Sequence, residues 1–71
     1  MKQTERILKY IDDFGSITQA QAFMDLGVMR LASRINDLKK AGYAIGDEYV
    51  SSKNRYGETV YYKKYYLKEV Q

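Results

Sequence analysis

The sequence predicts an α+β fold in which three helices precede a two-stranded β-hairpin. Apolar residues recur at helical spacing through residues 4–41. Residues 44–67 are instead rich in Tyr, Val and Ile, which favour strands, and a polar stretch with turn-forming Asn and Gly divides them. At 71 residues the chain has room for one core, so we expect a single domain over residues 1–71.

The first helix is predicted over residues 4–14, where the apolar residues at helical spacing are Ile7, Leu8, Ile11 and Phe14. Gly15 supplies a stop, because glycine tolerates the left-handed conformation found after many last turns. Residues 16–18 form an extended connector, and we expect a short strand there with Ile17 directed into the core.

The second helix is predicted to begin after Thr18 and to end near Gly27. Thr18 and Gln21 fit the capping-box pattern, in which the hydroxyl accepts a hydrogen bond from the amide three residues on. The Gln21 side chain then reaches back to the Thr18 amide. The apolar side of this helix is expected to comprise Ala20, Phe23 and Met24.

The third helix is predicted to start at Val28 and to run to about Ala41. At about 100° per residue, four aliphatic residues fall within one quadrant of it: Val28, Leu31, Ile35 and Leu38. The opposite side carries Met29, Arg30, Ser33, Asn36, Asp37 and Lys40, with Arg34 at its margin. Gly42 offers a left-handed stop, with Tyr43 placed to pack back on the helix.

The hairpin is predicted to have strands over residues 44–51 and 59–67, joined by a long basic tip at residues 52–58. Its buried face is expected to hold Ile45, Tyr49, Tyr61, Tyr65 and Leu67. The opposite parity is favoured by Val50, Val60 and Tyr62. A β-bulge at Gly46 is one way to reconcile the two patterns.

The composition excludes several classes of function. The chain contains no Cys and no His, which removes disulfide frameworks, thiol nucleophiles, Cys/His zinc sites and histidine-based catalysis. The adjacent carboxylates Asp12 and Asp13 diverge by about 100° on a helix, so we expect neither an enzyme nor a bound cofactor or metal. No apolar run approaches the roughly 18–20 residues of a membrane span, and no signal peptide is evident, so we expect a cytoplasmic protein without a membrane partner.

Positive charge gathers in the second half of the chain. Residues 1–28 carry three bases and four acids, a net −1, whereas residues 29–71 carry nine bases and five acids, a net +4. Two helices joined by a Gly-containing turn and followed by a hairpin form a helix-turn-helix with a wing. The predicted partner is therefore double-stranded DNA, whose major groove admits one helix.

Candidate DNA contacts lie on three parts of this arrangement. On the third helix they are Met29, Arg30, Ser33, Arg34 and Asn36, which include Arg for guanine and Asn for adenine. At the cap of the second helix they are Thr18 and Gln19. In the wing they are Lys53, Asn54, Arg55 and Tyr56, suited to phosphate or to the minor groove. Asp37, on the same helix face, opposes close approach of phosphate.

Several blocks of this sequence resemble a known family. They are residues 3–8, 15–18, 29–35 (MRLASRI), 38–43 and 53–57 (KNRYG). Together they resemble the small winged helix-turn-helix domain of phage and prophage proteins over nearly the whole chain. The resemblance implies a winged-helix fold and a DNA-binding role, as a transcriptional regulator or accessory factor. It carries that role over to Arg30, Ser33, Arg34, Lys53, Asn54 and Arg55.

The hairpin leaves other functions open. Its run from Tyr61 to Tyr66 is richer in Tyr than the family pattern, and Tyr is favoured at protein interfaces. A small phage protein with this fold can instead bind and inhibit a host protein, for example as an anti-CRISPR-type nuclease inhibitor. Tyr interleaved with Lys63 and Lys64 also resembles a stacking surface for single strands. A homodimer or a monomer assisted by a partner is a further expectation, because specific operators usually present two half-sites and one small domain offers limited area.

Overall fold

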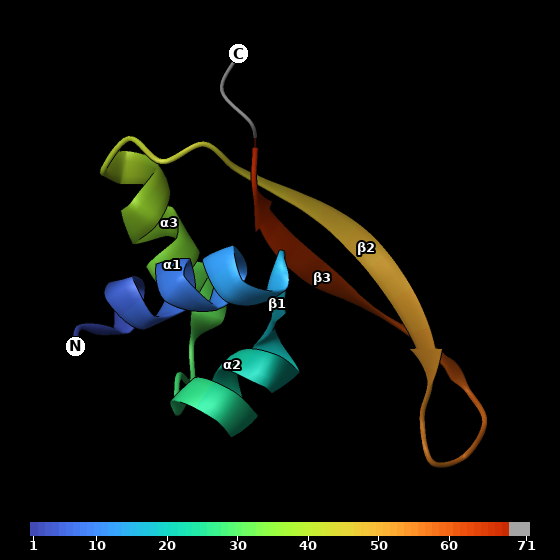
Figure 1. The fold of residues 1–71 in the computed structure, drawn as a ribbon. Coiled ribbons are helices and arrows are strands. Elements are labelled where there is room, and N and C mark those ends of the chain that lie inside the picture. Colours follow the sequence, from blue (N-terminus) through green and yellow to red (C-terminus); the bar gives the residue numbers. More distant parts are fainter. Residues whose placement is uncertain (69–71) are drawn as a thin grey trace.

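The computed structural model describes residues 1–68 and has three helices and a three-stranded antiparallel sheet. Along the chain the elements are α1 (Gln3–Phe14), β1 (Ile17–Thr18), α2 (Gln19–Leu26), α3 (Leu31–Lys40), β2 (Ile45–Lys53) and β3 (Thr59–Leu67). The strand order is β1-β3-β2, so the short β1 ties the helices to one edge of the hairpin. Figure 1 shows the helices gathered at one end and the hairpin reaching away from them.

The boundaries of α1, β1 and α2 follow the sequence prediction closely. Gly15 ends α1 in the left-handed region at φ 88°, and its N–H donates to Ile11 O at 2.7 Å. The predicted short strand is β1, with Ile17 fully buried. The capping box of α2 is present in both directions, between the Thr18 hydroxyl and the Gln21 amide and between the Gln21 side chain and the Thr18 amide.

The apolar side predicted for α2 is wrong. Ala22 is the buried residue of this helix, and Leu26, one turn later, packs partly against the core. Ala20 and Phe23 are exposed, and Met24 keeps 77% of its surface accessible. The small Ala22 side chain lets the helix backbone approach its neighbours, so the bulky side chains are left on the outside.

The third helix begins later than predicted, at Leu31. The Val28 N–H donates to Ala22 O at 3.0 Å, which closes the last turn of α2 and keeps the chain out of a new helix for residues 28–30. Arg30 then stands at the N-cap with φ −125° and ψ 72°. Met29 and Arg30 therefore lie in the turn, whereas the sequence placed them on the helix. Val28 is still fully buried, because its side chain enters the core from the turn.

A Schellman motif ends α3. Gly42 has φ 104°, the Tyr43 N–H donates to Leu38 O at 3.1 Å, and the Gly42 N–H donates to Lys39 O at 3.0 Å. The predicted stop at Gly42 is thus confirmed.

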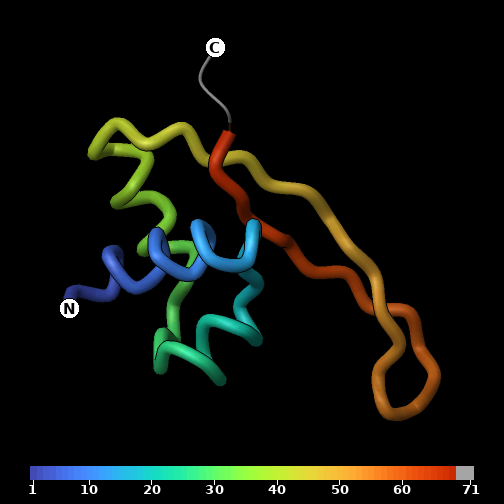
Figure 2. The backbone as a smooth tube through the Cα atoms, in the orientation of Figure 1, coloured from blue at the N-terminus to red at the C-terminus, as the bar shows by residue number. Residues whose placement is uncertain are grey.

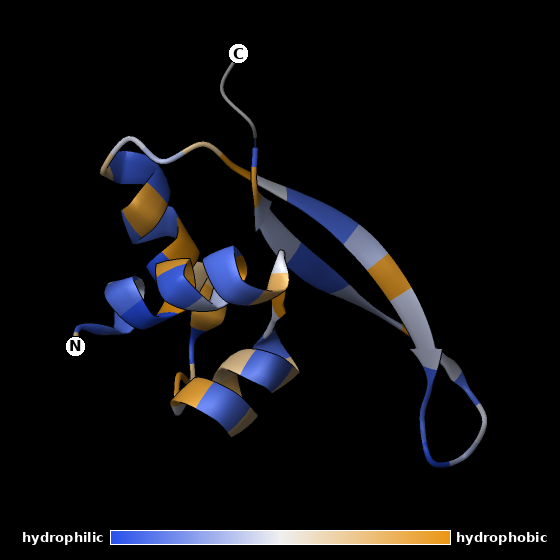
Figure 3. Cartoon of the chain, viewed as in Figure 1, coloured by the Kyte–Doolittle hydropathy of each residue, from blue (hydrophilic) through white to orange (hydrophobic). Residues whose placement is uncertain are grey.

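The core is a single cluster of small and medium aliphatic side chains. Its buried members are Ile7, Ile11, Ile17, Ala22, Val28, Leu31, Ile35, Leu38 and Ile45. The aliphatic quadrant predicted for α3 is all buried, which confirms that stripe. Figure 3 shows hydrophobic colour where α1 and α3 meet and pale or hydrophilic colour over most of the hairpin.

Only the base of the hairpin packs on this core. Ile45 is buried, and Tyr65 packs partly against the cluster, as the favoured parity predicted. Tyr49 and Tyr61, predicted to be buried on the same face, keep 70% and 71% of their surface accessible. The prediction failed because the strands run on past the helices, as the tube in Figure 2 shows, so alternation alone buries nothing there.

No bulge interrupts the ladder between β2 and β3. The register is continuous from Ile45 opposite Leu67 to Lys53 opposite Thr59, so the predicted bulge at Gly46 is wrong. The glycine instead leaves room for Tyr66, because a Cβ at position 46 would lie 2.6 Å from Tyr66 Cζ.

None of the helices in residues 1–68 combines the length and the apolar character needed to cross a membrane.

Substitutions at Ile35 test how strongly the core packing of α3 contributes to stability. Replacing Ile35 by Ala removes a side chain that is 1% exposed from a small core. The free energy of unfolding should fall by about 2–5 kcal/mol, against about 0.5–1.5 kcal/mol for Ile35→Val. Urea unfolding followed by circular dichroism measures both, and equal losses for the two variants would contradict the packing described above.

Candidate nucleic-acid interface

The side chain of Gln19 fixes the turn between α2 and α3. Its Nε2 donates to Val28 O at 3.1 Å, and its Oε1 accepts from the Leu31 N–H at 2.8 Å. The second bond satisfies one of the N–H groups that a helix start leaves without an intrahelical partner. Arg30 stands at the N-cap without a side-chain cap of its own, so Gln19 performs the capping from twelve residues away.

The outward face of α3 is polar. The buried residues Leu31, Ile35 and Leu38 define the inner side, and Asn36 lies exposed on the opposite side. Ser33 is half-buried on that outer side. Ser33 and Asn36, both predicted DNA contacts, lie outside the aliphatic stripe.

Arg34 and Asp37 form an ion pair on the same helix. Arg34 Nη2 lies 3.4 Å from Asp37 Oδ2, and both side chains keep a large part of their surface in solvent. Such exposed pairs contribute at most about 1 kcal/mol and are easily exchanged for another partner. Asp37 therefore restrains Arg34 without immobilising it.

Met29 and Arg30 project from the turn at the start of α3. Met29 keeps 70% of its surface accessible, and Arg30 is exposed. Within residues 1–68, the Arg30 guanidinium has no hydrogen bond or ion pair. An unpaired cation at this end of α3 is available to a ligand approaching the helix start.

The tip of the hairpin is organised by Asn54. Its Oδ1 accepts from the Tyr56 N–H at 2.9 Å and from the Glu58 N–H at 3.0 Å, and Gly57 takes φ 77°. Asn at the first position and left-handed Gly at the fourth suit a type I turn followed by a G1 bulge. The tip spans residues 54–58, shorter than the predicted 52–58 because the strands extend further.

The predicted wing contacts differ in whether their side chains are already hydrogen-bonded within the hairpin. Lys53 donates to Thr59 Oγ1 at 2.6 Å, and the Asn54 amide donates to Glu58 Oε1 at 3.1 Å. Arg55 and Tyr56 lie at the very end of the loop, where Tyr56 keeps 82% of its surface accessible. Their side chains make no hydrogen bond to any other part of the described chain.

Residues 2–70 match the model of a protein family described as the winged helix-turn-helix domain. The chain belongs to this family. In it α2, the Gln19-fixed turn and α3 form the helix-turn-helix, and β2 with β3 forms the wing. This is a DNA-binding fold that typically has no catalytic role. No curated protein and no solved structure matched significantly.

Within this winged helix-turn-helix domain, the two predicted contacts at the cap of α2 have internal roles. The Thr18 side chain is largely buried and accepts from the Gln21 amide at 3.3 Å. Both polar atoms of the Gln19 amide are engaged with the turn. The sequence gives no local signal for the second role, because Gln19 and Leu31 are distant along the chain and match no capping spacing.

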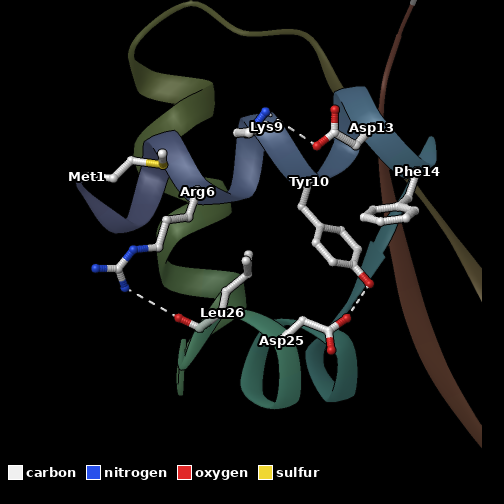
Figure 4. A pocket seen from close by; sticks show the side chains of 8 residues that line it. All are labelled: Met1, Arg6, Lys9, Tyr10, Asp13, Phe14, Asp25 and Leu26. Carbon is white, nitrogen blue, oxygen red and sulfur yellow. Dashed lines mark hydrogen bonds and ion pairs between the residues drawn. The ribbon is translucent and has the colours of Figure 1, made fainter.

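A second feature is a hollow of about 600 Å³ between α1 and the end of α2 (Figure 4). Tyr10 donates to Asp25 Oδ2 at 2.6 Å across it, and this hydrogen bond raises the pKa of Tyr10 above its usual value, with help from desolvation. At its rim Arg6 donates to Leu26 O at 3.3 Å. Its polar groups are thus paired with each other, and residues 1–68 contain no group of three acidic side chains placed to hold a metal ion.

Removing the two hydrogen bonds that the Gln19 side chain makes to the turn should lower the stability of the domain. In Gln19→Ala the Leu31 N–H and the Val28 carbonyl lose their partners, so the free energy of unfolding should fall by about 1–2 kcal/mol. Gln19→Glu keeps an acceptor for Leu31 but replaces the donor to Val28 O with a carboxylate oxygen, so it should also be less stable than the unaltered protein.

Asn36→Ala serves as the control, since this exposed amide has no hydrogen bond within residues 1–68. Thermal unfolding compares the three variants. A Gln19→Ala variant as stable as Asn36→Ala would show that the hydrogen bonds of Gln19 do not stabilise the turn.

Proposed function

We propose that this domain binds double-stranded DNA, with the start of α3 in the major groove and the tip of the wing on the backbone or in the minor groove. The observation that carries the proposal is Arg30, which lies exposed beside the first turn of α3 and makes no hydrogen bond or ion pair within residues 1–68. Arginine there suits either the O6 and N7 of guanine or a phosphate. Family membership supports the choice of DNA as the partner.

The remaining contacts follow from which side chains are free. Ser33 and Asn36 on the outer side of α3 offer hydrogen bonds to base edges, and Met29 offers an apolar contact to a thymine methyl group. Arg34 joins them after exchanging Asp37 for phosphate. In the wing, Arg55 and Tyr56 make the contacts, and Lys53 adds positive charge beside them. Thr18 and Gln19 support the turn rather than the DNA.

The charge distribution agrees with this assignment. Residues 29–71, which contain α3 and the wing, carry a net charge of +4, whereas residues 1–28 carry −1. A chain of this kind acts by occupying or marking a site on DNA, so we assign it the role of a transcriptional regulator or accessory factor. Its association with phage or prophage genes rests on the sequence blocks described above.

Arg30 provides the direct test. Arg30→Ala should weaken duplex binding by about 1–3 kcal/mol, or roughly five- to 150-fold, if the side chain contacts a base. Loss of a phosphate contact would also lower the slope of log K against log salt by about 0.9. Fluorescence anisotropy with a labelled duplex, repeated at several salt concentrations, measures both quantities.

Lys9→Ala is the matched control, because Lys9 lies on α1 and pairs with Asp13 at 3.5 Å. It removes the same charge and should leave affinity unchanged. Equal effects of the two variants, or no duplex binding by the unaltered protein at low salt, would contradict the proposal. The alternative is inhibition of a host protein through the exposed tyrosines of the hairpin. It would be favoured if the biological activity of the protein survived Arg30→Ala and was lost in Tyr61→Ala.

Asp37 should oppose binding. In Asp37→Asn a carboxylate leaves the outer face of α3 and Arg34 is released, so duplex affinity at low salt should rise by about two- to tenfold. Stability should change little, because the lost ion pair is exposed. Asp12→Asn, which makes the same charge change on α1, should bind as the unaltered protein does in the same titration. An Asp37→Asn variant that binds no more tightly than Asp12→Asn would contradict a DNA contact by this face.

A further inference from the structure

The outer edge of β2 is a long strand edge without a partner in residues 1–68. β2 is the last strand of the sheet, and β3 covers only its other edge. Beyond Asp47 the hairpin is also uncovered on both faces, where Tyr49 and Tyr61 are exposed on one side and Val60 and Tyr62 on the other. A two-stranded hairpin without further support is marginally stable in water, so pairing of β2 with another strand would stabilise it.

Two hydrogen bonds show which backbone groups face the free edge. The Lys68 N–H donates to Ala44 O, and the Asn54 N–H donates to Glu58 O, each at 2.9 Å, at opposite ends of the hairpin. Both pairs join even-numbered residues in one continuous register, so even-numbered pairs are the hydrogen-bonded ones. The N–H and C=O groups directed away from β3 are therefore those of Asp47, Tyr49, Ser51 and Lys53.

We propose that β2 pairs in antiparallel fashion with β2 of a second copy of this chain, in a register centred on Val50. Two-fold symmetry then sets Asp47 of each copy opposite Lys53 of the other, and Tyr49 opposite Ser51. All of these residues direct their backbone groups toward the free edge, so the ladder closes without any shift of β3. The two three-stranded sheets become one six-stranded sheet, in which the two hairpins supply the four central strands.

Charge complementarity favours this register. Only centring on Val50 brings Asp47 opposite Lys53, and symmetry makes that pair twice. Centring on Glu48 would place two carboxylates side by side, which is unfavourable. In the proposed register Glu48 faces Ser52, and its charge is already balanced by Lys64, whose Nζ lies 2.8 Å away in the same copy.

The side chains also match across the symmetry axis. On one face Val50 meets Val50, in a pair without ladder hydrogen bonds, where side chains approach most closely. Tyr62 lies opposite Val50 within each hairpin, so an apolar row of two valines flanked by two tyrosines forms. On the other face the two Tyr49 rings become diagonal neighbours, each with Lys63 beside it at 5.5 Å from the ring centroid.

Charge reversal tests the register. Analytical ultracentrifugation without DNA should show a concentration-dependent dimer for the unaltered protein. Asp47→Lys and Lys53→Glu should each weaken dimerisation by about tenfold or more, because each places like charges opposite one another twice. An equimolar mixture of the two variants should restore a dimer, since in the mixed pair every acid again faces a base.

The matched controls are Asp12→Lys and Lys39→Glu, which make the same charge changes on helices and should leave the dimer intact. Ser51→Pro removes an N–H directed to the free edge but none from the hairpin ladder, so it should abolish the dimer while the unfolding transition persists. A monomer at every concentration, a dimer that survives the reversals, or variants that fail to recombine would each overturn the proposal. Because DNA is absent, the result is independent of the proposed DNA binding.

Discussion

Burial of one aliphatic stripe of α3 is the constraint from which the rest of this domain follows. Leu31, Ile35 and Leu38 are at most 3% exposed and lie in one core cluster with Ile7 and Ile11 of α1. Each such side chain contributes about 1.5–3 kcal/mol when removed from water, so rotating α3 by half a turn is energetically excluded in a core this small. The polar side of the helix is outward as a consequence of that burial.

Local signals in the sequence were sufficient for most of the helical part. A capping box, glycines in the left-handed region and an aliphatic quadrant are each determined by neighbours within a few residues, and α1, β1, α2 and the end of α3 agree with prediction. The start of α3 was misplaced because Val28 has the spacing of a helical core residue while its N–H closes the preceding helix. Periodicity records which side chains are buried and does not record which backbone groups are bonded.

The errors in the hairpin and in α2 have a different cause. Alternation predicts that one face of a strand is covered, but only tertiary structure decides how far the cover extends. Here the helices cover Ile45 and Tyr65 and end before Tyr49 and Tyr61. Likewise the packing of α2 through Ala22 depends on the space left by other elements, which no local pattern encodes. The roles of candidate site residues were predictable by type, whereas the engagement of Gln19 and of Asn54 depended on contacts formed only after folding.

The loop at Asn54 lies at the end of a ribbon whose other end is fixed. Asn54 Oδ1 accepts from two backbone amides of the loop, and the strands behind the loop are paired without interruption. β1 pairs with the part of β3 that lies opposite Asp47 and Glu48, so the base of the ribbon is held against the helices. A change in the distance between Arg55 and Arg30 would then have to come from bending of the two-stranded part beyond Glu48.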